Sequence, residues 1–391
     1  MDRLDLIPAP HRAERLLIVD LLAGRNVPFD VDAEAFLAVA PKKLHPYLFL
    51  RLRNNARAAA VHAPLLDAYR RHALRELRRG AELRRIDGAL RGAGVRFLVL
   101  KGPVLAASVY PDRASRTMTD LDFLISEEEL PRAMEAMHTA GYFVPERFLG
   151  ATMEPGDSPP MIHEEPGGPS IELHTMLDSL PNERAALEAV IARARQVDVG
   201  HGLSLPALDR GEFFAHVAIH VSKHHRFEGE LRSLLDVALL LRHDGDLEWS
   251  TLLAEWDRRG IAEWIALTVT LAHVLLDAPL PPAIAERRVA DDALRIAAEL
   301  LWIEAKTDVP QRVTFALAGH DTATMHEGVG RHTVRMPRGI RSIPARAARQ
   351  LDRLQRVVAA VARPRKVAAA VDLHRKREQL FGIVEKRSVR D

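Results

Sequence analysis

The chain has 391 residues, 47% of them hydrophobic and 28% charged, so it can form two or three structural units and has the balance of a globular protein. It contains no cysteine, which excludes disulfides, thiolate metal sites and a cysteine nucleophile. The first 24 residues lack the apolar run of a secretory signal, and the most apolar stretch, from Trp264, is interrupted by His273 and Asp277. Together with 47 arginines against 8 lysines, these features favour a bacterial cytoplasmic protein without a membrane span.

The positive charge of the chain is concentrated at its C-terminal end. The net charge is +2, but residues 331–391 hold 17 Lys or Arg against 5 Asp or Glu, a net of +12, which leaves −10 for residues 1–330. Basic segments can bind nucleic acid or anionic membranes through counterion release. The favoured interpretation is a solvated helical face that neutralises the acidic remainder. Nucleic acid is therefore an open partner for this tail, but not the favoured one.

The N-terminal part of the chain is expected to be helical. Apolar residues recur at helical spacing in residues 32–40 and again from Pro64 onward. The second of these helices should end at Gly92 or Gly94, because glycine readily adopts the left-handed conformation that closes a helix. Residues 1–92 are therefore predicted to form an N-terminal helical region.

The hydrophobic period changes directly after this region. The segment RFLVL (96–100) predicts a short strand, which leads through a turn at Lys101 and Gly102 into a helix with Pro103 in its first turn. The segment TMTDLDFLI (117–125) alternates between polar and apolar residues and predicts a second strand. A strand, a tight turn and a helix thus precede a strand that carries acidic residues on one face.

A helix and two further strands are expected next. Ser126 and Glu129 have the spacing of a capping box at the start of a helix. The segments GYFV (141–144) and SIELH (170–174) predict strands, and a loop rich in glycine and proline separates them. The mixed core is therefore predicted to span residues 93–205.

Helical periodicity returns after the mixed core. Residues 206–330 are predicted to form a C-terminal helical domain, and residues 331–391 a basic helical tail. The predicted fold class is therefore α+β, with a small mixed β-sheet and flanking helices between an N-terminal helical region and a C-terminal helical domain.

Three acidic residues of the mixed core could share one site. Asp120 and Asp122 lie on the same face of their strand, about 6 to 7 Å apart along the backbone, so both can reach one divalent cation. Glu172 has an apolar residue on each side and would join them if its strand pairs beside theirs. Like charges this close raise one another's pKa, and divalent cations resolve that conflict. Oxygen ligands favour Mg²⁺ or Mn²⁺, and two such ions can assist an in-line displacement at phosphorus.

The order of these motifs resembles an uncharacterised bacterial nucleotidyltransferase family of the DNA polymerase beta-like superfamily. The similarity covers roughly residues 93 to 280 and comprises a strand with K-G, then R-x-x-x-D-x-D, E-L-H, H-x-x-x-H and L-R-S-L-L-D. The matching residues are Lys101, Gly102, Arg116, Asp120, Asp122, Glu172, His174, His220, His224, Arg232 and Asp236.

The resemblance implies a role for each group of residues. Asp120, Asp122 and Glu172 would be the catalytic and metal-binding residues of a nucleotidyltransferase core. Nucleotide contacts are expected from Lys101, Gly102, Arg116, His220, His224 and Arg232. The helix start after Gly102 would receive the triphosphate. Pro103 replaces the serine of the superfamily's usual Gly-Ser pair, so the phosphate contacts must differ there.

Histidines near these motifs allow other interpretations. His216, His220 and His224 recur every four residues and share a helical face, a spacing compatible with metal ligation, although a structural or phosphate-contacting role is favoured. His174, two residues after Glu172, is expected to orient that carboxylate. The sequence contains neither a G-x-S-x-G elbow nor a G-x-x-x-x-G-K-[ST] loop, which argues against a serine hydrolase and a P-loop kinase.

The implied activity is a metal-dependent transfer of a nucleoside monophosphate, with AMP favoured, from an NTP to an acceptor. The acceptor would be a hydroxyl or phosphate of a small molecule or of a peptide or protein, Mg²⁺ or Mn²⁺ the cofactor, and pyrophosphate the second product. Two alternatives stay open. One is a non-catalytic module of the same fold that binds a nucleotide or a partner, and the other is a phosphotransferase that acts at the γ-phosphate.

Overall fold

The computed structural model describes residues 2–148, 156–303 and 364–388. Contacts divide the chain into two compact units, Met1–Trp302 and Ile303–Asp391. In the second unit, helix α16 runs from Pro364 to Ser388, within the predicted basic tail. The rest of that tail, and the end of the predicted C-terminal helical domain from residue 304, lie outside the described residues. The domain boundaries stay predictions.

The N-terminal part of the first unit is helical, as predicted. Its α-helices are α1 (Arg12–Ala23), α2 (Ala33–Val39), α3 (His45–Leu52) and α4 (Ala59–Gly92). Short 3₁₀ turns join them or precede them, namely η1 (Arg3–Leu6), η2 (Lys42–Leu44) and η3 (Ala56–Ala58). Helix α2 begins where the Asp32 carboxylate accepts a hydrogen bond from the Ala35 backbone N–H at 2.8 Å. Helix α4 ends at Gly92, and Gly94 takes the left-handed conformation with φ +66°.

A mixed β-sheet forms the centre of the mixed core. Its strands are β1 (Phe97–Val99), β2 (Asp120–Ile125), β5 (Ser170–His174), β6 (Arg195–Asp198) and β7 (Ser204–Ala207), in the order β5-β2-β1-β7-β6. Strand β2 runs antiparallel to β1 and parallel to β5. Strand β7 runs parallel to β1 and antiparallel to β6. Two short strands, β3 (Tyr142–Phe143) and β4 (Ile162–His163), pair separately.

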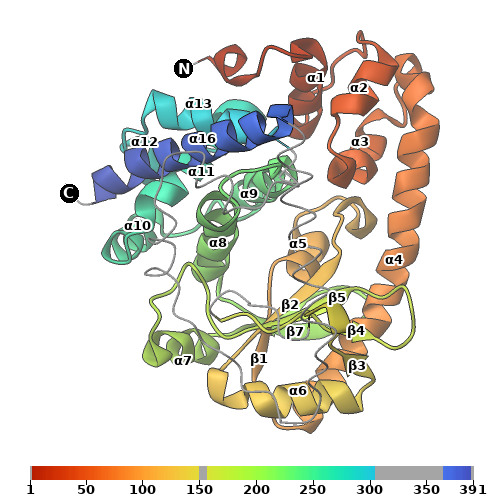
Figure 1. Cartoon of the computed structure of the whole chain (residues 1–391), viewed down its shortest axis with the longest axis vertical. Coiled ribbons are helices and arrows are strands. Elements are labelled where there is room, and N and C mark those ends of the chain that lie inside the picture. The colour runs from red at the N-terminus through yellow and green to blue at the C-terminus, as the bar shows by residue number, and fades with distance from the viewer. Residues whose placement is uncertain (1, 149–155, 304–363, 389–391) are drawn as a thin grey trace. The chain divides into compact units, whose positions relative to one another are not determined.

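Helices cover both faces of this sheet. Helices α6 (Leu130–Thr139) and α7 (Arg184–Ala192) lie below it in Figure 1, and α5 (Gly102–Ser108) lies above it. The apolar side of β2, with Leu121, Phe123 and Ile125, is completely buried. These side chains alternate with the acidic ones, so the burial of one face directs the carboxylates to the other.

Local contacts differ from the sequence prediction at two places. Ser126 does not cap a backbone N–H, because its hydroxyl donates to the Glu129 carboxylate at 2.9 Å, and a 3₁₀ turn, η5 (Glu127–Glu129), precedes α6. His163 lies in the segment predicted as a loop, but it is buried in β4 with its ring 4.9 Å from that of Tyr142. Two other short turns of the core are η4 (Arg113–Ser115) and η6 (Glu146–Phe148).

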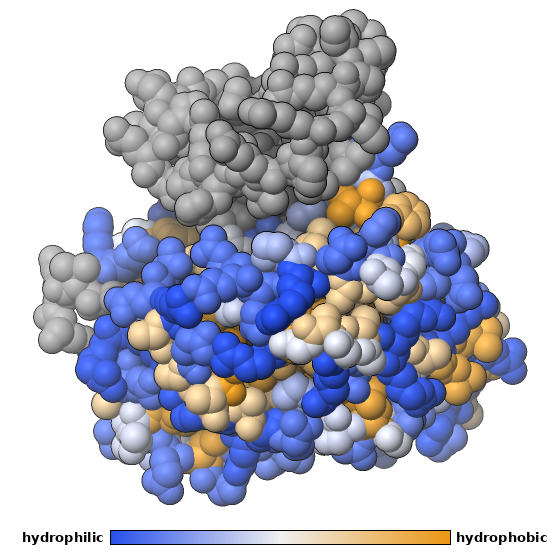
Figure 2. All heavy atoms as spheres, turned by 90° about the horizontal axis from the view of Figure 1, so that it is seen from below, coloured by the Kyte–Doolittle hydropathy of each residue, from blue (hydrophilic) through white to orange (hydrophobic). Residues whose placement is uncertain are grey.

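Helices follow the sheet up to the end of the first unit. They are α8 (Arg210–Ile219), α9 (Leu231–His243), α10 (Trp249–Arg258), α11 (Ala262–Leu276), α12 (Pro282–Ala285) and α13 (Asp291–Leu300), with a π-helical turn η7 (His220–His224) after α8. Helix α11 contains the most apolar stretch and buries most of its residues. Within the described residues, no helix is long and apolar enough to cross a membrane. On the face shown in Figure 2, hydrophilic side chains predominate and hydrophobic ones form small groups.

The predicted α+β class, a small mixed sheet with flanking helices, is confirmed. The sequence analysis did not predict α7, β6 or β7. Strand β7 was missed because Pro206 interrupts it, and proline is uncommon inside a sheet. The strand has only four residues, yet it lies inside the sheet between β1 and β6.

A buried ion pair joins the sheet to the C-terminal helices. The Arg116 guanidinium, in the segment before β2, donates from Nε and Nη2 to the two carboxylate oxygens of Asp236 in α9, at 2.9 and 2.8 Å. The two side chains are 4% and 2% exposed. The Tyr110 hydroxyl donates to the same carboxylate at 2.7 Å. Because both charges are buried and paired in a bidentate geometry, each depends on the other.

Replacing Asp236 by alanine should destabilise the fold by about 3–5 kcal/mol, because it leaves the Arg116 charge buried without its partner. Urea unfolding followed by circular dichroism measures this loss. The control is Asp292→Ala, which removes an exposed pair with Arg295 whose side chains are 53% and 68% exposed and should cost about 0–1 kcal/mol. Equal effects of the two variants would contradict the importance of the buried pair.

Candidate active site

Two carboxylates face each other across neighbouring parallel strands. Asp122 of β2 is the register partner of Glu172 of β5, and His174 lies opposite Leu124. Side chains of register partners emerge on the same face of a sheet. Candidate ligand atoms of Asp122, Glu172 and His174 accordingly lie within 4.8 Å of one another. The strand pairing on which the predicted carboxylate cluster depended is therefore present.

Asp122 is balanced by two cationic groups. Lys101 Nζ lies 2.9 Å from its Oδ2, and His174 Nε2 lies 3.4 Å from its Oδ1. Burial would raise the pKa of Asp122, but the charges and hydrogen bonds of Lys101 and His174 lower it far below its usual range. Asp122 is therefore an ionised carboxylate with both oxygens occupied.

His174 pairs with two aspartates rather than with Glu172. Its Nδ1 lies 2.8 Å from Oδ1 of Asp157, a residue that the sequence analysis did not single out. Burial opposes the imidazolium charge, but hydrogen bonds with Asp122 and Asp157 outweigh this effect and raise the pKa of His174 to about 9. The ring is therefore positively charged at neutral pH and fixes the position of Asp122.

Glu172 and Asp120 have no such compensation. Among the described residues, neither carboxylate has a hydrogen-bond or ion-pair partner. Glu172 is half-buried, and burial together with the negative charges of Asp122 and Asp120 raises its pKa. Asp120 lies exposed at the start of β2, opposite Ser170. The structure thus brings Asp122 and Glu172 together. It places Asp120 on the same face of β2, at the exposed start of that strand.

The donor set fits a divalent cation that prefers oxygen. Two unpartnered carboxylates, Asp120 and Glu172, lie beside a third, Asp122, and their mutual repulsion is reflected in the raised pKa of Glu172. Mg²⁺ and Mn²⁺ favour such ligands and relieve such repulsion. Asp122 reaches a cation only if Lys101 gives up its contact with Oδ2.

Lys101 holds a central position between strand β1 and helix α5. Its backbone is left-handed, with φ +36°, a strained conformation for a residue other than glycine. Its ammonium group donates to His220 Nε2 at 3.3 Å in addition to its contact with Asp122. At the adjacent Gly102, a Cβ atom would come within 2.9 Å of Met118 Sδ. A side chain at position 102 would therefore have to displace Met118, and the turn directs Lys101 across the site.

A cavity of about 300 Å³ opens in front of these residues, lined by three parts of the first unit. The N-terminal helices contribute Lys42, Lys43, His72 and Arg75, the core contributes Lys101, Gly102, Arg116, Asp120 and Asp122, and the C-terminal helices contribute His220, His225 and Arg232. Glu172 and His224 are not among the lining residues. The basic groups of the N-terminal helices were not predicted, because they are far from the motifs in sequence.

A larger cavity of about 450 Å³ is lined by residues of α5, α8 and α9 and the segment after α9. It contains none of the predicted site residues, and its Arg210 is paired with Asp244 and Asp246. The smaller cavity, which is lined by Asp120 and Asp122, is therefore the candidate active site.

The two predicted arginines differ in their availability. Arg116 lines the cavity, but Asp236 occupies its guanidinium, so it supports the cavity wall. Arg232 has a longer contact with Asp236, 3.5 Å from Nη1, and is 16% exposed. Arg232 is therefore better placed than Arg116 to meet an anionic group in the cavity.

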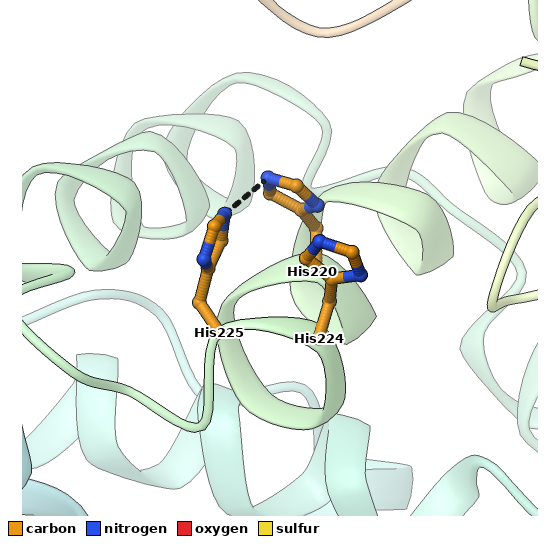
Figure 3. Close-up of side chains that lie close together, drawn as sticks. All are labelled: His220, His224 and His225. Atoms are coloured by element: carbon orange, nitrogen blue, oxygen red, sulfur yellow. Dashed lines mark hydrogen bonds between the residues drawn. The ribbon is translucent and has the colours of Figure 1, made fainter. Parts of the chain in front are cut away.

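A group of histidines borders the cavity at η7 (Figure 3). His220, His224 and His225 have candidate ligand nitrogens within 4.8 Å of one another, whereas the rings of His216 and His220 are 6.0 Å apart. Burial, followed by the charge of Lys101, keeps the pKa of His220 well below its usual value, and burial is also the main cause that lowers the pKa of His225 to about 4. His225 was not predicted, because the i, i+4 pattern omits it.

The site has the arrangement expected of a nucleotidyltransferase. One strand carries two carboxylates, a parallel strand places a third carboxylate opposite, and a strand-to-helix turn lies beside them. A family profile described as "Uncharacterised nucleotidyltransferase" matches residues 30–277, and the chain belongs to this family. This confirms the resemblance and extends it to most of the N-terminal helices. No curated protein matches the chain.

The pairing of His174 makes stability depend on pH. The pKa of His174 rises from its usual value of 6.5 to about 9 in the folded protein, so the stabilisation is fully present below pH 6.5 and is lost as the pH rises through 9. The loss should amount to at most about 3 kcal/mol. Urea unfolding in EDTA between pH 6 and 9.5 measures it.

The variant His174→Gln should lack this pH dependence, whereas the matched control His138→Gln, at an exposed position in α6, should retain it. An unchanged slope in His174→Gln would show that His174 is not the group responsible.

Proposed function

We propose that the chain transfers a nucleoside monophosphate, preferably AMP, from an NTP to a hydroxyl or phosphate oxygen of a small molecule or of a peptide or protein, and releases pyrophosphate. The observation that carries the proposal is the register pairing of Asp122 with Glu172 beside Asp120. Membership of a nucleotidyltransferase family supports the same reaction class.

In the proposed reaction the acceptor oxygen attacks the α-phosphorus in line. A new P–O bond forms, the bond between the α-phosphorus and the α,β-bridging oxygen breaks, and pyrophosphate leaves with the bond electrons. For a hydroxyl acceptor, the proton goes to Glu172, whose raised pKa suits a base. A divalent cation held by Asp120, Asp122 and Glu172 would supply charge neutralisation at the attacking and leaving oxygens.

The nucleotide and the acceptor would approach from different sides. Lys43, Arg75, Lys101 and Arg232 line the cavity and provide positive charge for a triphosphate. Glu172 is not part of the cavity lining and belongs to β5, which ends the order of the central sheet. The acceptor would therefore reach the α-phosphate from the β5 side, with the nucleotide in the cavity.

The carboxylates can be tested by conservative substitution. Asp122→Asn and Glu172→Gln each preserve shape but remove a charge, and each should lower kcat/KM by about 10²–10³-fold. Release of labelled pyrophosphate and transfer of label from α-labelled ATP to candidate acceptors measure the activity. Glu127→Gln, at an exposed carboxylate just after β2, is the matched control and should keep wild-type activity. Wild-type rates in Asp122→Asn would contradict the proposal.

The position of the label separates the proposed reaction from the alternatives. With α-labelled ATP the acceptor should gain label, and with γ-labelled ATP only pyrophosphate should carry it. Label that reaches the acceptor only from the γ-position would instead identify a phosphotransferase. If calorimetry detects nucleotide binding but neither label moves with any acceptor, a non-catalytic module is the better description.

A further inference from the structure

We propose that His220, His224 and His225 form a site for a transition-metal ion of the zinc class, separate from the carboxylates. Each histidine offers one ring nitrogen, and these nitrogens lie within 4.8 Å of one another. Figure 3 shows the three rings grouped on one side of the turn. The chain contains no cysteine, so imidazole is the softest ligand it offers to such an ion apart from methionine.

The π-helical turn brings the three rings together. In a regular α-helix, residues four apart share a face and the next residue points away by a further step of about 100°. The wider turn of η7 places His225 beside His220, with their rings 4.3 Å apart, and stacks His224 on His220 at 4.9 Å. Turns of this kind occur frequently at functional sites.

The distances are close to those of a three-histidine metal site. His220 Nε2 and His225 Nε2 lie 2.9 Å apart. With Zn–N bonds of about 2.0–2.1 Å, tetrahedral ligands are separated by roughly 3.3 Å. The two nitrogens that share a proton in this structure therefore need to separate only slightly to bind a cation instead. His224 offers a third ring nitrogen within 4.8 Å of these two.

A carboxylate orients the third histidine. His224 Nδ1 lies 2.9 Å from Oδ2 of Asp178. Metal-binding histidines commonly donate their other N–H to a carboxylate in this way, which fixes the ring and increases its basicity. Asp178 thus has the position of an outer-shell residue rather than that of a ligand.

Charges around the three histidines both favour and oppose a cation. Asp178 and Glu230 provide negative charge on the sides of His224 and His225. The Lys101 ammonium, 3.3 Å from His220 Nε2, opposes the cation. The Lys101 ammonium must therefore move away from His220 Nε2 when a metal ion takes that nitrogen. Three protein ligands leave a fourth position for water or a substrate oxygen on the exposed side of His224.

The experiment uses the full-length protein, stripped with EDTA and returned to buffer with excess Mg²⁺ so that oxygen sites are filled. Co²⁺ is then titrated, and its visible spectrum distinguishes four-coordinate nitrogen ligation, with intense absorption, from six-coordinate oxygen ligation, with weak absorption. Equilibrium dialysis with Zn²⁺ gives the stoichiometry. We expect one equivalent of either ion and an intense Co²⁺ spectrum.

Variants assign the site to these residues. His225→Gln and His224→Gln should abolish the intense spectrum, and Asp178→Asn should weaken Zn²⁺ binding by about 10–100-fold. His138→Gln, an exposed histidine in α6, is the control and should bind like wild type. Circular dichroism of each variant verifies folding.

Two results would overturn the proposal. One is that the wild-type protein, in the presence of Mg²⁺, binds no Zn²⁺ or gives only the weak Co²⁺ spectrum. This result needs no variant. The other is a folded His225→Gln that binds as tightly as wild type.

Discussion

The site depends on one constraint, the placement of like charges on neighbouring strands. The register of β2 and β5 sets Asp122 opposite Glu172, and the buried apolar faces of the two strands keep both carboxylates on the other face of the sheet. Lys101 and His174 contact Asp122, whereas burial and the charges of Asp122 and Asp120 raise the pKa of Glu172. The strained turn at Lys101 holds its ammonium group beside this face, and the buried pair of Arg116 and Asp236 supports the cavity wall.

The pattern of the sequence predicted much of the sheet but not its full extent. Strict alternation identified β2, and an apolar run before Lys101 and Gly102 identified β1, because burial of one face leaves a clear period. The β6–β7 hairpin was missed, since its strands are short and one contains Pro206. Adjacency in the sheet depends on contacts between distant segments, which a local period does not encode.

The site was predicted in part for similar reasons. Residue types and motif order pointed to Asp122 and Glu172 as partners on the condition that their strands pair, and the structure contains this pairing. The occupation of Arg116 by Asp236 and the approach of His225 to His220 depend on side-chain packing and on a local widening of the helix. Neither contact can be predicted from the spacing of residues along the chain. Sequence patterns therefore identified candidate residues by their chemical type, but not the partners that they contact.

The most direct test of the account is a crystal structure with Mn²⁺ and a non-hydrolysable α,β-methylene analogue of ATP. Anomalous scattering should place manganese between the carboxylates of Asp122 and Glu172, near the α-phosphate, with Lys101 Nζ moved from Asp122 towards the phosphates. Manganese bound elsewhere, with the nucleotide outside the cavity and Lys101 still paired with Asp122, would contradict the assignment of the carboxylates as the centre of nucleotidyl transfer.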